Sequence, residues 1–481
     1  MGILPQIKHI VVVMLENRAF DDMCGWLYKP GTPQPTQFLP PESPQHLNGN
    51  KSSYFNPVSA DYFEGKSTET YPVFDQATAT DTPNPNPQEG FDNTTYQLFG
   101  PEPPSPNPKW PNLGFVVSYS VVARPDIPVQ IMEPFSPAQV PVISALATNY
   151  AVCDEWFCSV PSQTWPNRAF FHAGTANGNV NNGDPIPNPF DWDVRNIFIV
   201  MDDIGVSWRV YHDTVIVPPM TWLMFPNLWL KLDHFPGFDD FKSDCASGKL
   251  PQYSFIEPSF LINPNDEHPP HDVVAGEQFL YEIWQAVSQS PLWPETLLMI
   301  TYDEHGGTHD HVHPPYGAVT PDEKSNPGKE GFRFDRFGVR VPCVLVSPWI
   351  QAGTVFRSPT ATPYDHSSML ATLRDWLEVP TDKWLASKRV AAAPTLQQVF
   401  TLTQARTDKP AIPQPAAEVK ETSTFKPPTA LQQSLVSAWA VQQGKDPAAV
   451  LSTIQTRQDA IDYFKANPHP GAPTGASSPA R

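Results

Sequence analysis

The side chains best suited to chemistry follow two apolar segments that lie far apart in the chain. Residues 10–15 run directly into Glu16 and Asn17, and residues 296–302 run directly into an Asp-Glu pair at 303–304. Continuous apolar runs of this length are typical of buried strands in an α/β sheet. Open sheets of this class bind ligands beyond the carboxyl ends of their strands. Three carboxylates and an amide that meet there would offer oxygen ligands to a divalent cation.

A simpler interpretation of the first segment stays open. Asn and acidic residues are common at helix starts, so Glu16 and Asn17 could instead cap a helix that begins near Phe20. The second segment favours a site more strongly, because its two carboxylates and His305 follow a buried strand and would cost stability if they were idle. The glycines at 306–307 then permit a tight backbone turn beside a ligand.

Alternating histidines follow in the segment Thr308-His309-Asp310-His311-Val312-His313. This segment superficially resembles the zinc motif of metallo-β-lactamase-type hydrolases. There, however, the order is His-x-His-x-Asp-His, whereas here the aspartate lies between the first two histidines. The alternative is a solvated loop with one or two useful histidines. A zinc enzyme of that class would depend on His309 and His313 but not on Glu16.

A turn rich in hydroxyl groups, residues 159–168, follows a short predicted strand that leads to Asp154. Ser and Thr in a proline-bounded turn are usually only turn residues. A hydroxyl beside a metal ion can lose its proton and attack phosphorus, which makes the hydroxyls of this turn candidate nucleophiles. Arg168 carries a fork of donors that suits phosphate oxygens.

Histidines also occur at two predicted helix starts. Residues 265–272, Asn-Asp-Glu-His-Pro-Pro-His-Asp, lead into one helix, and residues 364–368, Tyr-Asp-His-Ser-Ser, lead into another. A lone histidine at a helix start is more often a cap than a catalyst. Several such segments in one chain favour convergence on an anion, because helix N-termini attract negative charge.

Composition limits the classes of partner. The 481 residues carry a formal net charge of −19, so a general nucleic-acid surface is not expected, since phosphate binding needs clusters of Lys and Arg. The negative charge by itself indicates only solubility, whereas an anionic substrate would need a local positive centre such as a bound metal. The 59 prolines predict long irregular loops over a globular scaffold.

The cysteines and the N-terminal residues add weaker constraints. The five cysteines form no dense disulfide framework and no Cys-x-x-Cys zinc spacing, although Cys153 and Cys158 could pair if the turn between them folds back. The apolar stretch after Lys8 is short and ends in charge, so we expect neither a signal peptide nor a transmembrane segment there. Export by another route, or after removal of a leader, stays open, and no compartment is predicted.

The periodicity of the chain predicts the elements that position these side chains. Strands are predicted at residues 7–15, 150–152, 296–302 and 341–347, and helices at residues 138–146, 272–289 and 365–376. The order of helix and strand indicates the α/β class.

Composition also divides the chain into three predicted units. Residues 1–405 form the α/β domain, with loop excursions at about 29–112 and 175–250. Residues 406–428 are rich in Pro, Lys and Thr and predict a linker. Residues 429–481 predict a helical C-terminal extension, since Ser/Thr/Asp-type caps precede three helical patterns.

These segments together resemble the phosphoesterase family of non-specific phospholipases C and related bacterial acid phosphatases, within the alkaline phosphatase superfamily. The matching motifs occur in the family's order and cover roughly residues 7–400; they are Glu16-Asn17-Arg18-Ala19-Phe20-Asp21, Thr164-Trp165-Pro166-Asn167-Arg168, His268-Pro269-Pro270-His271-Asp272, Asp303-Glu304-His305-Gly306-Gly307 and His366-Ser367-Ser368. The resemblance implies an alkaline-phosphatase-like catalytic domain, with a central, mostly parallel sheet flanked by helices.

The resemblance also implies roles for individual residues. One divalent metal ion would be held by Glu16, Asn17, Asp303 and Glu304. Thr164 takes the place of the nucleophile that forms a phospho-enzyme. Phosphate contact or proton transfer is implied for His268, His271, His305 and His366, and substrate binding for Asn167, Arg168, His311 and Asp154. The oxygen ligands favour Ca, Mg or Mn over Zn.

The chain also departs from the family pattern. Ala19 replaces the usual Ser, Asp22 stands where a His is common, and His309 replaces an aromatic residue. Residues 83–99 match only loosely and lack a histidine that some members carry. The resemblance therefore does not assign a head-group preference.

The combined interpretation is a metal-dependent phosphoesterase that forms a phosphothreonine intermediate. Phospholipase C-type cleavage of phospholipid head groups is the predicted activity. Phosphoryl transfer needs mainly positioning and charge neutralisation, which these residues would supply. The first alternative is an acid phosphatase that acts on soluble phosphomonoesters. The second is a non-catalytic ligand-binding protein on a degenerate hydrolase scaffold. No oligomeric state is predicted.

Overall fold

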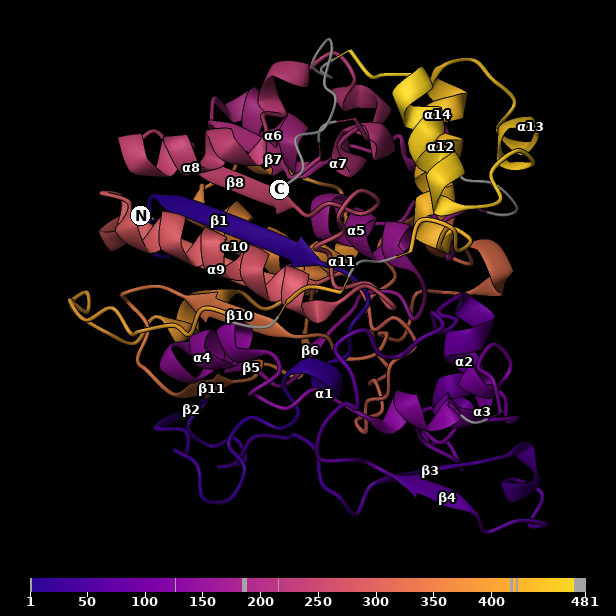
Figure 1. The fold of residues 1–481 in the computed structure, drawn as a ribbon. Helices are drawn as coiled ribbons and strands as arrows, with labels where there is room; N and C mark the ends of the chain where they lie inside the picture. The colour runs from indigo at the N-terminus through magenta and orange to yellow at the C-terminus, as the bar shows by residue number, and fades with distance from the viewer. Residues whose placement is uncertain are drawn as a thin grey trace.

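A mixed sheet of eight strands runs through the centre of the molecule, in the order β2-β11-β5-β10-β9-β1-β8-β7 (Figure 1). The strands are β1 (His9–Leu15), β2 (Gln37–Leu39), β5 (Ala151–Cys153), β7 (Trp208–His212), β8 (Tyr253–Glu257), β9 (Thr296–Tyr302), β10 (Cys343–Val346) and β11 (Thr354–Phe356). β10 is antiparallel to both of its neighbours, and the other pairings in the sheet are parallel. This computed structural model describes residues 2–125, 127–183, 188–214, 216–415, 418–420 and 423–470. The predicted α/β fold with a mostly parallel central sheet is confirmed.

The two strands that carry the acidic segments are neighbours at the middle of the sheet. β1 and β9 are parallel, and their register places Leu15 opposite Tyr302. β9 is buried along its whole length and β1 beyond its first residue, which explains why their sequences lack polar alternation. Because both strands end at the same level, the residues that follow them emerge side by side.

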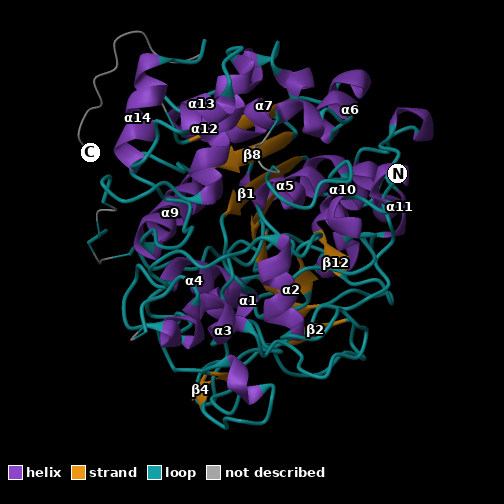
Figure 2. Cartoon of the chain, turned by 90° about the vertical axis from the view of Figure 1, so that its right-hand side faces the viewer, coloured by secondary structure: helices purple, strands orange, loops and turns teal. Residues whose placement is uncertain are grey.

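Helices cover both faces of this sheet. Figure 2 shows α4 (Pro141–Asn149) and α9 (Val273–Gln289) on one side of the central strands and α5 (Thr164–Ala173) and α10 (His366–Trp376) on the other. Asp272 and Asp365 cap α9 and α10 through their side chains. α4 begins three residues later than predicted, because Pro141 occupies its first turn, where a missing N–H costs nothing.

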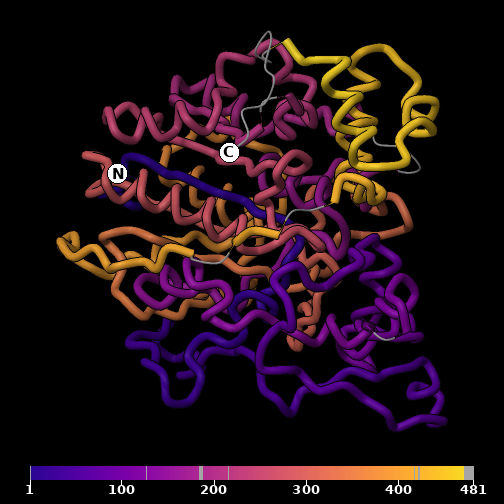
Figure 3. The backbone as a smooth tube through the Cα atoms, in the orientation of Figure 1, coloured from indigo at the N-terminus to yellow at the C-terminus, as the bar shows by residue number. Residues whose placement is uncertain are grey.

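The first predicted excursion, residues 29–112, forms the lower part of the molecule in the view of Figure 3. It is mostly irregular, but it also contains β2, β3 (Phe55–Pro57), β4 (Thr70–Pro72) and the helix α2 (Phe91–Phe99). Its neighbour α3 (Phe115–Ser120) packs against α2. The sequence prediction missed α2, which lies directly after a run of prolines.

The second predicted excursion, residues 175–250, is not an excursion from the core. It contributes the edge strand β7 to the central sheet, together with α6 (Ile197–Ile204), α7 (Met220–Met224) and α8 (Phe238–Ser247). Of this range, residues 184–187 and 215 lie outside the described residues. Aromatic side chains of this segment are packed inside, as the burial of Trp208 and Trp222 shows.

The predicted C-terminal helices are present as α12 (Ala430–Gln442), α13 (Pro447–Leu451) and α14 (Arg457–Ala466). They pack on the main body through α7, where the rings of Trp439 and Trp222 lie 6.2 Å apart. Residues 471–481 of the predicted extension, and residues 416–417 and 421–422 of the predicted linker, lie outside the described residues. The domain boundaries themselves stay a prediction.

Short elements complete the description. They are α1 (Phe20–Met23), β6 (Trp156–Phe157), β12 (Tyr364–Asp365) and α11 (Lys388–Ala392). All five cysteines are buried and free, so the pairing of Cys153 with Cys158 does not occur. Among the described helices, none combines the length and apolar character needed to cross a bilayer.

Candidate active site

The ends of β1 and β9 bring the two acidic segments into direct contact. The backbone N–H of Asn17 donates a hydrogen bond to Asp303 Oδ1 at 2.9 Å. Asn17 adopts a left-handed backbone conformation with φ of 58°, which asparagine tolerates better than most non-glycine residues. A Cβ at Gly306 would lie 2.1 Å from the carbonyl oxygen of Asn17, so this close approach requires glycine.

The helix-cap alternative for Glu16 and Asn17 is wrong. The N-cap of α1 is Ala19, and no side chain caps that helix among the described residues. The side chains of Glu16 and Asn17 point instead to the first residue of α5.

Thr164 begins α5 and meets the acidic segments through its hydroxyl. Its Oγ1 lies 3.2 Å from Glu16 Oε2 and 3.5 Å from Asn17 Oδ1. The preceding turn is held in place by Asn167, whose side-chain oxygen accepts from the N–H of Val160 at 2.8 Å and whose amide donates to three carbonyl groups of the turn. The structure thus brings Thr164 to the predicted ligands, while Asn167 shapes the turn rather than facing the acids.

Arg168 lies one helical turn after Thr164 and pairs with Glu16. Its Nε donates to Glu16 Oε1 at 2.9 Å, and its Nη2 contacts the same oxygen and the carbonyl of Met14. Both side chains are buried. Arg168 Nη1 has no hydrogen-bond partner among the described residues, so this nitrogen is available for an anionic ligand.

Neighbouring groups neutralise only part of the negative charge of Glu16, Asp303 and Glu304. Burial raises the pKa of Glu16 and of Asp303, although Arg168 acts to lower both values, and burial together with the neighbouring Asp303 raises the pKa of Glu304. Asp303 Oδ2 and Glu304 Oε1 are buried and find no hydrogen-bond partner in the described ranges. Carboxylates outnumber the single guanidinium of Arg168 here, and this excess of negative charge fits a bound cation.

Two histidines approach the same region from the segment before α9. His271 Nδ1 lies 2.5 Å from Asp266 Oδ1, and His268 Nδ1 lies 2.7 Å from the carbonyl of Pro269. The Nε2 atoms of both rings are buried without a partner among the residues described here. The carbonyl of Asp266 accepts from the N–H of Glu16 at 2.8 Å, which ties this segment to the end of β1. Burial lowers the pKa of His268 to about 4, so its ring is neutral at pH 7.

His305 is held on its other side by α2. Its Nε2 donates to Gln97 Oε1 at 2.8 Å, and its Nδ1 lies 3.2 Å from Glu304 Oε2. Burial lowers the pKa of His305 to about 3. α2 therefore matters to the site because it orients this ring.

The sequence prediction missed two carboxylates of the site. Glu89, just before α2, is buried, and its charge acts to raise the pKa of Glu304. It lies in a proline-rich segment in which the spacing of residues does not indicate a functional site. Asp266, the partner of His271, could have been found, because it belongs to the acid-histidine segment at 265–272.

Two predicted site residues already have protein partners for their polar atoms. His366 accepts from Trp156 Nε1 at 3.2 Å and donates through Nε2 to the carbonyl of Asp303 at 2.6 Å, so both ring nitrogens are occupied. Asp154 forms a two-pronged pair with Arg357 at 2.8 and 2.7 Å. Neither side chain is free to contact a substrate in this arrangement.

His311 belongs to a second acidic cluster. Its Nδ1 lies 2.6 Å from Asp21 Oδ2 and its Nε2 lies 3.0 Å from Asn48 Oδ1. Ligand atoms of Asp21, Asp310 and His311 lie within 4.8 Å of one another, a spacing that could hold a metal ion. The guanidinium of Arg340 already pairs with Asp21 at 2.9 Å and with Asp310 at 3.0 Å, so a cation occupies this cluster. His309 and His313 do not join it in a three-histidine zinc site.

Comparison with known proteins gives the family context. A profile of the phosphoesterase family matches residues 7–380. Non-specific phospholipase C3 of Arabidopsis thaliana is 36% identical over 426 residues, which cover 84% of this chain and 75% of that protein. Phospholipase C B of Mycobacterium tuberculosis is 27% identical over 429 residues, which cover 79% of this chain and 75% of that protein. The solved structure of phosphonate monoester hydrolase from Agrobacterium radiobacter aligns with 54% of this chain and 72% of its own, at 15% identity and a TM-score of 0.29, which supports no further conclusion.

Proposed function

The chain belongs to the phosphoesterase family, as its motifs suggested, and we propose that it cleaves phospholipid head groups in the manner of a phospholipase C, through a phosphothreonine intermediate. The observation that carries this proposal is the contact of the Thr164 hydroxyl with Glu16 and Asn17, beside two unpaired carboxylate oxygens. Family membership makes the chain a phosphoric ester hydrolase, and the non-catalytic alternative is set aside.

Glu16, Asn17, Asp303 and Glu304 would hold one divalent ion, with Ca, Mg or Mn favoured because the ligands are oxygen atoms. The unpaired oxygens and the raised carboxylate pKa values fit this role, since a cation would relieve both. When bound, such an ion lowers the pKa of a neighbouring hydroxyl and neutralises a phosphate oxygen.

Thr164 performs the first step. Its hydroxyl gives up a proton, Oγ1 forms a bond to phosphorus, and the bond from phosphorus to the alcohol oxygen breaks. The alcohol leaves with one proton, and the head-group phosphate stays on Thr164. Water then attacks the same phosphorus and releases the phosphorylated head group, which restores the threonine.

His268 and His271 carry the protons in these steps. Their unpaired Nε2 atoms face no described partner, and Asp266 holds the ring of His271 at Nδ1. Thr164 loses one proton and the leaving alcohol gains one, so the protons of this step balance. A neutral imidazole can accept the proton from Thr164 and then donate it to the alcohol. In the second step the same ring takes a proton from water.

Arg168 and the remaining residues position these groups. Arg168 holds Glu16 and directs its free Nη1 to a phosphate oxygen. His366 fixes the backbone of Asp303, and His305 lies against Glu304. Asn167 keeps the turn before Thr164 in shape. Asp154 and His311 would act through structure rather than by touching substrate.

Replacing the nucleophile tests the mechanism. Thr164→Ala should lower the turnover of p-nitrophenyl phosphate and of phosphatidylcholine by at least about a thousandfold, because the acceptor oxygen is lost. Thr164→Ser should keep a measurable rate, since it keeps the hydroxyl. Rapid quenching and mass spectrometry should find phosphate on residue 164 in the wild type and in Thr164→Ser but not in Thr164→Ala. Unchanged turnover in Thr164→Ala would show that another group attacks phosphorus.

The same assay separates lipid from soluble substrates. Phosphatidylcholine should be preferred over soluble sugar phosphates and nucleotides in turnover per enzyme. The reverse preference would favour the acid phosphatase alternative.

A further inference from the structure

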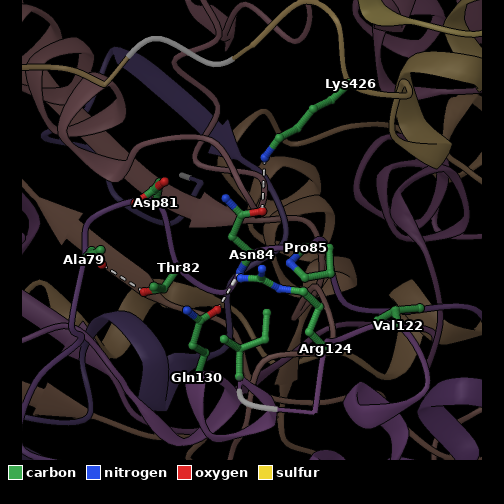
Figure 4. A pocket seen from close by; sticks show the side chains of 10 residues that line it. Ala79, Asp81, Thr82, Asn84, Pro85, Val122, Arg124, Gln130 and Lys426 are labelled. Atoms are coloured by element: carbon green, nitrogen blue, oxygen red, sulfur yellow. Dashed lines mark hydrogen bonds between the residues drawn. The ribbon is translucent and has the colours of Figure 1, made fainter.

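A surface pocket with a volume of about 550 Å³ lies where two loops meet the segment before α12. Its walls come from residues 79–85, from residues 122–124 and 127–130, and from Lys426. Figure 4 shows the side chains of Arg124 and Lys426 both extending toward Asn84, although they come from segments about 300 residues apart in the chain. This pocket is separate from the side chains around Thr164.

The pocket carries an excess of positive charge. Lys426 Nζ donates to Asn84 Oδ1 at 3.4 Å, and neither Lys426 nor Arg124 forms an ion pair with any residue in the described part of the chain. Asp81, an acid in its wall, is already paired with Lys420 at 2.7 Å. Within the described residues, these two cations without an ion-pair partner stand out on a chain whose net charge is −19.

Large apolar side chains are exposed beside these cations. Phe425, which precedes Lys426, is 82% exposed, and Val121, three residues before Arg124, is 75% exposed. Val419, which precedes Lys420, is also exposed. Exposed apolar side chains interleaved with Lys and Arg are typical of surfaces that lie in the interface of a bilayer.

The pocket also lies close to the proposed catalytic groups. Arg18 donates through Nη1 to the carbonyl of Thr82 in the pocket wall, at 2.7 Å. The same guanidinium donates through Nε to the carbonyl of Glu267, next to His268, also at 2.7 Å. The buried side chain of Arg18 therefore connects the pocket wall to the segment that carries the proton-transfer histidines.

We propose that Val121, Arg124, Phe425 and Lys426 form a docking surface for a phospholipid bilayer that contains anionic lipids. Phe425 and Val121 would enter the head-group boundary, while Arg124 and Lys426 would contact lipid phosphates. The pair of cations directs this face of an otherwise acidic molecule to the membrane. This inference rests on the proposed function, because it delivers the enzyme to its lipid substrate.

A second exposed apolar group provides a matched control. Leu230 is 99% exposed and Phe190, whose ring lies 5.7 Å from that of Trp229, is 57% exposed. Lys231, the residue after Leu230, has its charge paired with Asp202 at 2.8 Å. This group has apolar surface without a free cation. It should therefore not bind anionic vesicles.

Vesicle co-sedimentation tests the surface with the full-length protein. The charge variant Arg124→Gln/Lys426→Gln should bind phosphatidylcholine vesicles that contain phosphatidylserine about 25-fold more weakly than the wild type, at about fivefold per cation, and high salt should abolish the difference. The apolar variant Val121→Ser/Phe425→Ser should lose binding to vesicles with and without phosphatidylserine. The control variant Phe190→Ser/Leu230→Ser should bind like the wild type.

Hydrolysis of soluble p-nitrophenyl phosphate separates this inference from the proposed function. All three variants should keep the wild-type rate on that ester, because none of the changed residues contacts Thr164. Wild-type binding by the charge variant, or equal loss in the control variant, overturns the docking surface. A wild type that binds vesicles but hydrolyses no phosphate ester overturns the proposed function instead.

Discussion

Two buried acidic clusters in this protein look alike in composition and differ in how their polar atoms are satisfied. The first cluster consists of Glu16, Asp303 and Glu304 beside Thr164, and the second consists of Asp21 and Asp310 around Arg340. In the second cluster every nitrogen of the guanidinium has an acceptor, including the carbonyls of Asn48 and Asp154. In the first, two carboxylate oxygens have no partner among the described residues.

The difference separates a structural cluster from a reactive one. Buried polar groups in native proteins are nearly always hydrogen-bonded, so two unpaired carboxylate oxygens in one cluster suit a bound ion or water there. His311 and Arg340 lower the pKa of Asp21 to about 2 against the effect of burial, whereas burial and Asp303 raise the pKa of Glu304. Short distances between acids do not by themselves indicate a metal site, because a fixed guanidinium can fill the same place.

Removing an acid from the first cluster should have the largest effect. Asp303→Asn should lower phosphate-ester hydrolysis by at least about a thousandfold, because a ligand of the ion is lost. In chelator, the variant should be as stable as the wild type or more stable, since one of three mutually repelling carboxylates is gone. Enzyme kinetics and urea unfolding measure the two effects.

A metal titration adds a readout that does not depend on activity. Added Ca, Mg or Mn should raise the melting temperature of the wild type but not that of Asp303→Asn. If Asp310→Asn abolished this rise and Asp303→Asn kept it, the roles of the two clusters would be reversed.

Removing the cation of the second cluster should lower the stability of the fold. Arg340→Met should lower the free energy of unfolding by about 3–5 kcal/mol, because it leaves Asp21 and Asp310 buried without their cation. Urea unfolding in chelator, with Asp303→Asn as the matched comparison, measures the loss. Wild-type stability of Arg340→Met would mean that the second cluster is not held by this guanidinium.

His172 is a third case, because its ring is buried and its nitrogens lack hydrogen-bond partners among the described residues, although it belongs to neither cluster. Both of its ring nitrogens lack a partner in the described structure, and its ring packs among Phe171, Phe198 and Phe255. Burial lowers its pKa well below the ordinary value of 6.5. Below pH 6.5 this histidine therefore binds a proton in the unfolded chain but not in the folded chain. The free energy of unfolding consequently decreases as the pH falls.

His172→Phe should remove this pH effect. The variant should be about 1 kcal/mol more stable than the wild type at pH 7, and its advantage should grow by roughly 1 kcal/mol for each pH unit below 6.5. Urea unfolding at several pH values measures the trend, with ester hydrolysis expected to stay unchanged. Loss of hydrolysis would instead place His172 in the reaction.

Local patterns predicted much of the fold. The apolar runs of β1 and β9, and the caps Asp272 and Thr429, were visible in the sequence, because each depends on residues within one element. β7 was missed because Trp208–His212 mixes aromatic and charged residues and becomes a strand only through pairing with β8. Strand formation depends on such distant neighbours more than helix formation does.

The candidate site divides in the same way. The sequence determined which residue types end the strands, so Glu16, Asn17, Asp303 and Glu304 could be named before any coordinates, and the register of two adjacent parallel strands then made them meet. Only the tertiary structure decided that the polar atoms of His366, Asp154 and His311 bond to protein groups, His366 among them to the backbone of Asp303. The physical reason is that the type of a residue determines which hydrogen bonds its side chain can form. The partners in those hydrogen bonds come from distant segments, and packing of the whole chain sets the positions of these segments.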